Sequence, residues 1–457
     1  MDKRTDKRTD RKTDERTGKP PVFTPEEIAR FRAELAARRT PGAHEPGRWS
    51  VSPLNRRPDV AGPLPASVRL RDATLRSVET LPGVVASAAA KEAFLRGLVA
   101  GGVAEVVTAG LGDRTDAALK GEVELVKGAD DACRVICPLM RSTEDVDRAA
   151  AAGYDAVQVW VQAFGEAALL YQPQAYARAW RGEEWRTGDT PRDRAAVLAR
   201  AARLVSYARE RGLTVIVPLL MVSYATEESH EESVTVLTAA GAGEFTLFDG
   251  PGAMSPEAYA HLVRLTRALA PAVEVGLHPH NTFGLAVACA VAAVRAGAGT
   301  VELSVNGYCG GPGNADLAAT ALAFEALYGV RTGVRTERLT ELARMGEKLT
   351  GYHTAWNHPV TGSHAFCWGG LDFITQETEI DPLLHNCVEP ALVGNARRVP
   401  FTLDSGPYTL ADKLAARGLA LGRAQVDDVL DRARELMARE GRLPTDEELA
   451  ALAEEVR

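Results

Sequence analysis

Eight short runs rich in β-branched and apolar residues alternate with longer helical stretches from about residue 67 onward. The runs read SVRLRD, AEVVTA, CRVICPL, AVQVWVQ, LTVIVPLL, EFTLFD, VEVGLH and TVELSV. Strands that alternate with helices in this way form a parallel sheet, and eight units over roughly 250 residues are the number that closes a (β/α)8 TIM barrel. We therefore expect an α/β fold with this barrel over residues 67–330. An open doubly wound sheet is the alternative, disfavoured because no GxGxxG follows the first run.

The chain before the barrel divides into two parts. Its first eighteen residues, MDKRTDKRTDRKTDERTG, repeat a four-residue charged unit. Such a segment cannot offset the entropy lost on ordering, so we expect a disordered tail over 1–22. The following TPEEIARFRAELAARR opens with a Thr-Pro-Glu helix start. We expect an N-terminal helix and linker over 23–66.

Composition limits the class of protein. The 457 residues carry a formal net charge of −8 and a hydrophobic fraction of 46%, which is ordinary for a soluble globular protein. The acidic balance argues against a nucleic-acid partner. No apolar run reaches the ~18–20 residues that a membrane helix needs, so we expect a cytoplasmic protein without a membrane partner. Six cysteines do not make a disulfide framework in so long a chain, and Cys133 and Cys137 are expected to be buried free thiols.

Two histidines end the seventh run, in EVGLHPHNTFGLA. Side chains alternate along a strand with period two, so His278 and His280 share one face. Two imidazoles on one face can bind a divalent metal, although structural histidines are the alternative. A metal site needs at least one further ligand, which the sequence must supply elsewhere.

Polar residues also follow three other runs, in RDATLR, FDG and NGYCGGPGN. The active site of a TIM barrel lies at the C-terminal ends of its strands, so these segments are expected to meet the histidine pair. Each has a simpler explanation as well. Asp249 and Gly250 suit a turn, and the glycines at 310–313 can bend the chain before a helix capped by Asn314.

The segment GLHPHNTFGLAVACAVAAVRAGAGTVELSVNGYCGGPGNADL, residues 276–317, resembles the HxHN stretch and G-x-G-N loop of the TIM-barrel metallolyases. DATLRSVETLPG, residues 72–83, is similar to their first-strand motif D-x-T-L-R-D-G-x-Q-x-P-G. This superfamily includes 2-isopropylmalate, citramalate and homocitrate synthases, 3-hydroxy-3-methylglutaryl-CoA (HMG-CoA) lyase and aldolases. NHPVTGSHAFCWGGLDF and VEPALVGNARRVPFTLDSG resemble segments of the synthases. The resemblance implies small, mostly helical, synthase-like subdomains over 331–457.

The resemblance also implies a set of metal ligands. By position, a divalent Zn, Mn or Mg ion is expected at His278, His280 and Asn314, and Ser77 stands where the family has a carboxylate ligand. A neutral hydroxyl is a poorer ligand than a carboxylate for these ions, so metal binding is expected to be weaker. Glu79 or a substrate carboxylate is a candidate to complete the ligand set.

Other roles follow from the same motifs. Arg76 carries a permanent, forked cation that suits a carboxylate or a developing enolate, so we expect it in substrate binding and catalysis, with a structural salt bridge as the alternative. Glu79 is a candidate base, or else a solvated surface acid. Ser77 and Asp249 are expected to contact substrate. Cys309 is expected to be a buried or incidental thiol.

Departures from the family pattern leave three functions open. Synthases have Thr at the position of Gly250, and their tail histidines are missing from FCWGGLD, where Trp368 and Asp372 stand. The first hypothesis is a Claisen-type acyltransferase that condenses an acyl-CoA with a 2-oxo acid, on an altered substrate. The second is an aldolase or lyase acting next to a 2-oxo acid, and the third is a metal-free or non-catalytic relative. The resemblance further implies a homodimer.

Overall fold

The computed structural model describes residues 23–78, 80–112, 114–162, 164 and 194–457. The tail expected over 1–22 and the side chain of Glu79 lie outside these residues. The chain forms two compact units. One contains the chain up to Pro53 with Trp356–His358 and Ser363–Arg457, and the other contains Leu54–Ala355 with Pro359–Gly362.

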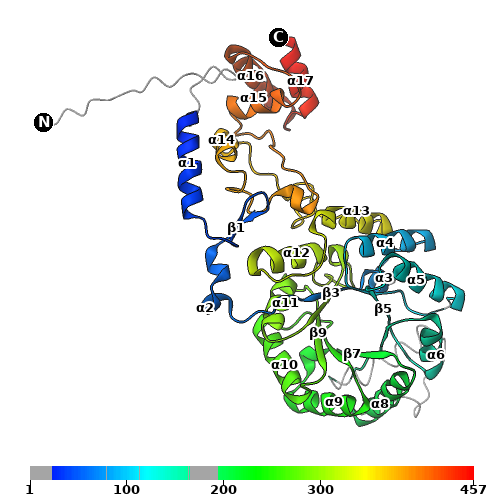
Figure 1. Ribbon diagram of the computed structural model, residues 1–457. Coiled ribbons are helices and arrows are strands. Elements are labelled where there is room, and N and C mark those ends of the chain that lie inside the picture. The colour runs from blue at the N-terminus through cyan, green and yellow to red at the C-terminus, as the bar shows by residue number, and fades with distance from the viewer. Residues whose placement is uncertain (1–22, 79, 113, 163, 165–193) are drawn as a thin grey trace. The chain divides into compact units, whose positions relative to one another are not determined.

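The larger unit is a closed barrel of eight parallel strands, in the order β10-β3-β4-β5-β6-β7-β8-β9. Helices surround the strands (Figure 1). Each of the eight runs that we expected to be strands contains a strand, and the predicted TIM barrel is confirmed. The strands are β3 (Arg69–Asp72), β4 (Glu105–Val107), β5 (Arg134–Cys137), β6 (Ala156–Gln158), β7 (Thr214–Leu220), β8 (Glu244–Asp249), β9 (Glu274–Pro279) and β10 (Thr300–Leu303).

The helices of this unit alternate with the strands and begin with side-chain caps in most cases, as the hydroxyl and carboxyl residues before them predict. Thr115, Ser142, Thr226 and Ser255 are examples of such caps. Among the described residues, the helices are α2 (Pro58–Ala61), which precedes the barrel, and α3 (Thr74–Val78), α4 (Ala88–Ala100), α5 (Asp116–Ala129), α6 (Thr143–Ala152), α8 (Arg194–Glu210), α9 (Glu227–Ala240), α10 (Pro256–Leu269), α11 (Ala286–Arg295), α12 (Leu317–Leu322) and α13 (Leu339–Thr350).

The barrel interior has an apolar layer and a charged one. The apolar layer packs Ala73, Val107, Ile136, Ala156 and Ile216. In the charged layer the fully buried Arg71 binds three carboxylates, Glu105 and Glu244 at 2.7 Å each and Glu302 at 3.6 Å. Gly276 makes room for this layer, because a Cβ atom there would lie 2.8 Å from Oε1 of Glu244.

The smaller unit is mostly helical after the barrel, as expected. An antiparallel pair, β1 (His44–Glu45) and β2 (Trp49–Ser50), follows α1 (Pro25–Arg38). Its later helices are α14 (Asp372–Ile380), α15 (Pro407–Ala415), α16 (Arg423–Glu440) and α17 (Asp446–Glu455). The last three share an apolar core that includes Leu410, Val429 and Leu449.

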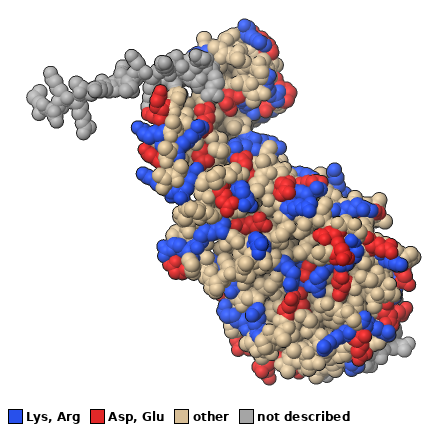
Figure 2. All heavy atoms as spheres, viewed as in Figure 1, with Lys and Arg blue, Asp and Glu red and all other residues tan. Residues whose placement is uncertain are grey.

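All six cysteines are free, and Cys133 and Cys137 are buried, as predicted. Among the described residues, none of the helices combines the length and apolar character needed to cross a bilayer. Basic and acidic side chains are interspersed over the face drawn in Figure 2.

Candidate functional site

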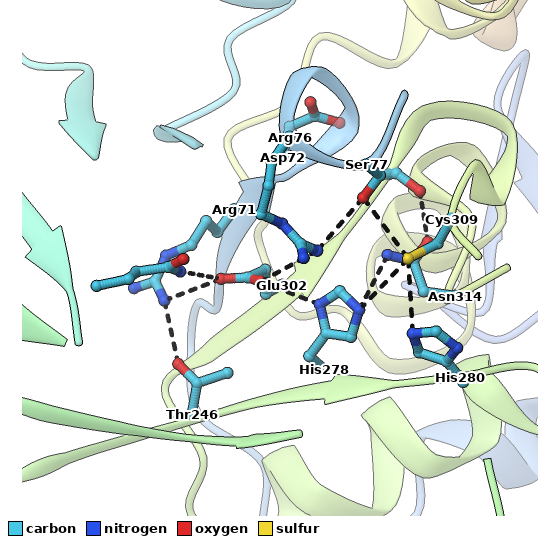
Figure 3. A network of polar contacts seen from close by, with 12 residues as sticks. Arg71, Asp72, Arg76, Ser77, Thr246, His278, His280, Glu302, Cys309 and Asn314 are labelled. Carbon is cyan, nitrogen blue, oxygen red and sulfur yellow. Dashed lines mark hydrogen bonds and ion pairs between the residues drawn. The ribbon is translucent and has the colours of Figure 1, made fainter. Parts of the chain in front are cut away.

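The two histidines stand at the C-terminal end of β9, between β8 and β10. Gly276 faces the barrel interior beside Glu244, so the period of two points His278 the same way. His278 is fully buried, and the phenyl ring of Phe248 stacks on its imidazole with the centroids 3.9 Å apart. His280, just past the strand, is half-buried. Both imidazoles face the same group of side chains (Figure 3).

The loop after β10 carries two more polar side chains to the histidines. Its backbone folds back on itself, with the amide of Asn314 donating to the Gly307 carbonyl at 3.1 Å. The amide of Asn281 donates to the Gly313 carbonyl at 2.9 Å, which joins the loop to the chain after β9. Cys309 and Asn314 are thereby placed next to His278 and His280 (Figure 3).

Three atoms that can bind a metal ion, one each from His278, His280 and Cys309, form a cluster. Sγ of Cys309 lies 4.0 Å from Nε2 of His278 and 3.5 Å from Nε2 of His280. The cluster can hold a metal ion, because its ligand atoms all lie within 4.8 Å of one another. Oγ of Ser77 lies 3.6 Å from the same sulfur.

Glu302, on β10, fixes the state of His278. Its Oε1 lies 3.0 Å from Nδ1 of His278, and a carboxylate accepts, so Nδ1 carries a proton and Nε2 is the ring nitrogen directed at the cluster. Gln158 donates to the other carboxylate oxygen at 2.7 Å. Burial opposes ionisation of Glu302, but the hydrogen bond and charge of His278, with the charges of Arg76 and Arg71, lower its pKa to about 2.

The thiol and the imidazole shift each other's ionisation. Burial raises the pKa of Cys309, but its hydrogen bonds with His278 and His280 and the nearby positive charges outweigh burial and hold the pKa well below the usual value. Burial lowers the pKa of His278, whereas its bonds to Cys309 and Glu302 raise it, and the net change is upward. The cluster therefore stabilises a negatively charged sulfur.

The chemistry of the ligand atoms tests whether the site fits a cation. The Ser304 hydroxyl contacts the Tyr308 carbonyl at 2.8 Å and Oδ1 of Asn314, and Nδ2 of Asn314 lies 3.5 Å from Nε2 of His278, so the amide borders the cluster. Two imidazole nitrogens and a cysteine sulfur that lie within 4.8 Å of one another are ligand types that bind divalent transition metals. The residues therefore fit a divalent metal.

Arg76 extends from α3 over the same cluster. Its Nη2 donates to Oγ of Ser77 at 3.3 Å and lies 3.9 Å from Oε1 of Glu302. The guanidinium also lies 5.0 Å from the ring centroid of Trp160 and 5.7 Å from that of Phe248. At these distances the aromatic rings stabilise the cation and limit its access to water.

A cavity of about 2090 Å³ opens beside the cluster. Its wall includes Arg76, Trp160, Phe248, His280 and Cys309. Farther from the cluster it is lined by α4, α5 and the chain before α6. Of the described lining residues, six are basic and four acidic, namely Arg76, Lys91, Arg96, Arg114, Arg141 and Arg200 against Glu92, Glu122, Glu124 and Asp145.

The structure brings together most of the residues selected from the sequence: Arg76, Ser77, His278, His280 and Asn314. Asp249 lies apart from the cavity wall. It is buried, and its Oδ2 accepts the amide of Met254 at 2.9 Å, which closes the turn after β8. Its contact with substrate stays a prediction, as does the role of Glu79, which the structure does not describe.

The two tail residues noted from the sequence have contacts within the smaller unit. Asp372 accepts the amides of Tyr408 and Thr409, at 3.2 and 2.8 Å, and so caps α15. Trp368 donates its indole N–H to Asn386 at 2.8 Å.

Sequence reasoning missed two members of the site. Cys309, expected to be a buried or incidental thiol, is buried as predicted but also points at both histidines. Glu302 was not selected at all, although an acid within the apolar run TVELSV has the period-two spacing of an interior residue. That spacing was the available signal.

Comparisons with known proteins agree with the geometry. The family model described as HMGL-like matches residues 185–345. An (R)-citramalate synthase of Methanopyrus kandleri is 33% identical over 398 residues, which cover 86% of this chain and 73% of that protein. A 2-isopropylmalate synthase of the same organism is 32% identical over 382 residues, 82% of this chain and 70% of that protein.

Among solved structures, the HMG-CoA lyase of Bacillus subtilis superposes with a TM-score of 0.52 at 19% identity, covering 64% of this chain and 96% of that chain. This likeness shows the barrel fold. The identities to the two synthases, over most of both chains, show the family. The chain belongs to the 2-isopropylmalate and citramalate synthase family of the TIM-barrel metallolyases, and it is an enzyme, either an acyltransferase or a carbon–carbon lyase.

Proposed function

We propose that this enzyme condenses an acyl-CoA with a 2-oxo acid, as the synthases of its family do, on a substrate that differs from theirs. One observation carries the proposal. The Arg76 guanidinium, the His278–His280–Cys309 cluster and a large cavity meet at the C-terminal end of the barrel. This is where a 2-oxo acid can be held by its carboxylate while its carbonyl faces a Lewis acid.

The residues of the site have distinct tasks in this reaction. Arg76 binds the carboxylate of the 2-oxo acid or the developing enolate oxygen, for which its planar fork of donors is suited. His278, His280 and Asn314 hold the divalent metal, which supplies polarisation of a carbonyl oxygen and stabilisation of negative charge when bound. Glu302 keeps His278 in the tautomer that presents Nε2.

The cavity supports acyl-CoA as the second substrate. Its volume of about 2090 Å³ exceeds the roughly 300–1,000 Å³ of sites for small ligands. The excess of basic over acidic lining residues favours an anionic ligand. An acyl-CoA is both large and anionic.

The glycine at position 250 supports the proposal that the 2-oxo acid differs from those of the synthases. A Cβ atom there would lie 3.3 Å from Sδ of Met221 and 3.8 Å from the Phe248 ring, so the position has little room for a larger residue. The synthases resembled by this sequence carry a Thr hydroxyl here. Without it, recognition of the 2-oxo acid depends more on Arg76.

The experiment is a substrate panel. Purified enzyme is incubated with acetyl-CoA or longer acyl-CoAs and a series of 2-oxo acids, and free CoA thiol and the condensation product are measured. CoA release that depends on both substrates supports the proposal. A 2-oxo acid or aldehyde released from a hydroxy acid, without CoA, would show the lyase hypothesis instead, and neither reaction with any substrate would contradict both.

Arg76 gives the matched variants. Arg76→Lys keeps the charge but loses the fork, and we expect kcat/KM for the 2-oxo acid to fall at least about 100-fold, as for loss of a transition-state donor. Arg264→Lys, on the exposed face of α10, is the control. Equal kcat/KM values in the Arg76 variant and the control would show that Arg76 does not bind the substrate.

A further inference from the structure

We propose that Cys309 is a protein ligand of the metal, replacing the carboxylate that Ser77 lacks, and that the site therefore prefers Zn²⁺ to Mg²⁺ or Mn²⁺. That this metal takes part in catalysis rests on the proposed function. The geometry of the ligands stands without it.

The distances suit one ion. In a tetrahedral site with Zn–S near 2.3 Å and Zn–N near 2.05 Å, sulfur and nitrogen lie about 3.6 Å apart. Sγ of Cys309 is 3.5 Å from Nε2 of His280 and 4.0 Å from Nε2 of His278. Both contacts lie within a few tenths of an ångström of that separation. Two imidazoles and a thiolate supply three nitrogen and sulfur ligands, the number of protein ligands in catalytic zinc sites, with Asn314 or a substrate oxygen for the fourth position.

Ser77 and Cys309 occupy complementary places. The hydroxyl oxygen of Ser77 and the sulfur are 3.6 Å apart, and both residues are buried. A carboxylate at position 77, one bond longer, would meet the sulfur. The short side chain at 77 therefore leaves space for the thiol, and the thiol restores the anionic ligand that the serine cannot provide.

The second coordination layer completes the argument. Glu302 accepts from Nδ1 of His278 at 3.0 Å, as carboxylates do behind histidines that bind metal. Arg76 donates to Oγ of Ser77 at 3.3 Å, and the Ser77 hydroxyl lies 3.6 Å from Sγ of Cys309. Sγ also faces the two imidazoles.

The choice of metal follows from ligand chemistry. Thiolate is a soft ligand that favours Zn²⁺, whereas Mg²⁺ and Mn²⁺ favour carboxylate, carbonyl and water oxygens. Exchanging one carboxylate for one thiolate therefore raises the preference of the site for Zn²⁺ over Mg²⁺ and Mn²⁺. The same cluster without metal would instead hold a thiol nucleophile, and the experiment separates the two.

The full-length enzyme is stripped of metal and loaded with Co²⁺, which reports thiolate ligation by a sulfur-to-cobalt charge-transfer band in the near ultraviolet. We expect the band in the native protein and its loss in Cys309→Ser. We also expect Zn²⁺ affinity in that variant, measured by chelator competition, to fall at least about 100-fold, beyond the effect of removing a second-layer partner. Cys289→Ser, a buried cysteine whose sulfur faces the Met254 carbonyl at 3.5 Å, is the control and should keep band and affinity.

A reciprocal variant tests the exchange directly. Ser77→Asp combined with Cys309→Gly should lose the charge-transfer band and bind Mn²⁺ more tightly than the native protein does. Absence of the band in the native protein, or unchanged Zn²⁺ affinity in Cys309→Ser, overturns the inference, and the native spectrum decides even where a variant fails to fold. The band without CoA release contradicts the proposed function alone, whereas CoA release without the band contradicts this inference alone.

Discussion

At the scale of single residues, Glu302 determines how His278 enters the cluster. It accepts from Nδ1 of His278 at 3.0 Å and from Gln158 at 2.7 Å. The buried carboxylate also lies within 3.6 Å of Arg71. A neutral amide at this position changes the tautomer preference of the imidazole without a large change in shape.

We therefore expect Glu302→Gln to weaken metal binding by about 10–100-fold, the usual effect of losing such a partner. Chelator competition measures the affinity, and Glu257→Gln, an exposed acid on α10, is the control. Unaltered metal affinity in Glu302→Gln would mean that the carboxylate stabilises the ion pairs of Arg71 but does not orient His278 for metal binding.

At the scale of elements, two turns position the site. Asp72 ends β3 and accepts the amide and hydroxyl of Thr74 at 2.9 and 2.8 Å and the amide of Val305 at 3.2 Å. It thereby joins the turn that carries Arg76 to the loop after β10. Burial raises the pKa of Asp72 to about 7, against hydrogen bonds that favour the ionised form.

A pH dependence follows. The folded protein keeps the Asp72 proton at pH values where the unfolded chain has lost it. The stabilisation that this proton contributes is therefore fully present below about pH 4, and it is lost as the pH rises toward about 7. The contribution of this group to the free energy of unfolding falls by up to about 1.4 kcal/mol per pH unit in that window.

Asp72→Asn should remove this slope, which urea unfolding at several pH values measures. Asp131→Asn, an exposed control, should retain it. The same slope in Asp72→Asn as in the control would show that the carboxyl titrates normally in the folded protein.

The loop that carries Cys309 and Asn314 depends on Gly313. Its φ is +84°, and a Cβ atom would lie 2.0 Å from the Gly307 carbonyl oxygen. Gly311 has a similar φ, +63°, but open space around it. Alanine at either position pays about 1 kcal/mol for the left-handed backbone.

Only Gly313→Ala also collides, so we expect it to cost about 1–3 kcal/mol more than Gly311→Ala and to weaken metal binding. Urea unfolding and chelator competition on the two variants measure both effects. Equal behaviour of the pair would show that the loop adjusts without disturbing the site.

At the scale of the whole molecule, Arg71 joins its own strand to the two neighbouring strands and to one that is not adjacent. From β3 it reaches Glu105 on β4, Glu244 on β8 and Glu302 on β10. A buried cation among three carboxylates adds little net stability while complete, but removing it leaves buried negative charges without a partner.

Arg71→Leu is expected to lower the free energy of unfolding by about 3–5 kcal/mol. Arg264→Leu, on the exposed face of α10, should change it by at most about 0.5 kcal/mol. Urea unfolding followed by circular dichroism compares them, and similar midpoints would contradict a structural role for the buried network. The homodimer implied by the resemblance also stays a prediction, which the molar mass in solution tests.

The sequence by itself determined the barrel and most of the site. Strand and helix periods are local, so eight alternating units predicted the barrel, and the two-residue spacing of His278 and His280 predicted their common face. The resemblance placed Arg76, Ser77 and Asn314. These predictions depend on neighbouring residues or on whole motifs, which a sequence displays directly.

The tertiary structure alone decided that Cys309 faces the histidines and that Glu302 lies behind His278. Ser77 and Cys309 are 232 positions apart in the chain. They meet because the last strand, β10, pairs with the first, β3, when the barrel closes. Contacts made by closure depend on the register and twist of all eight strands together, and no local pattern in the sequence records them.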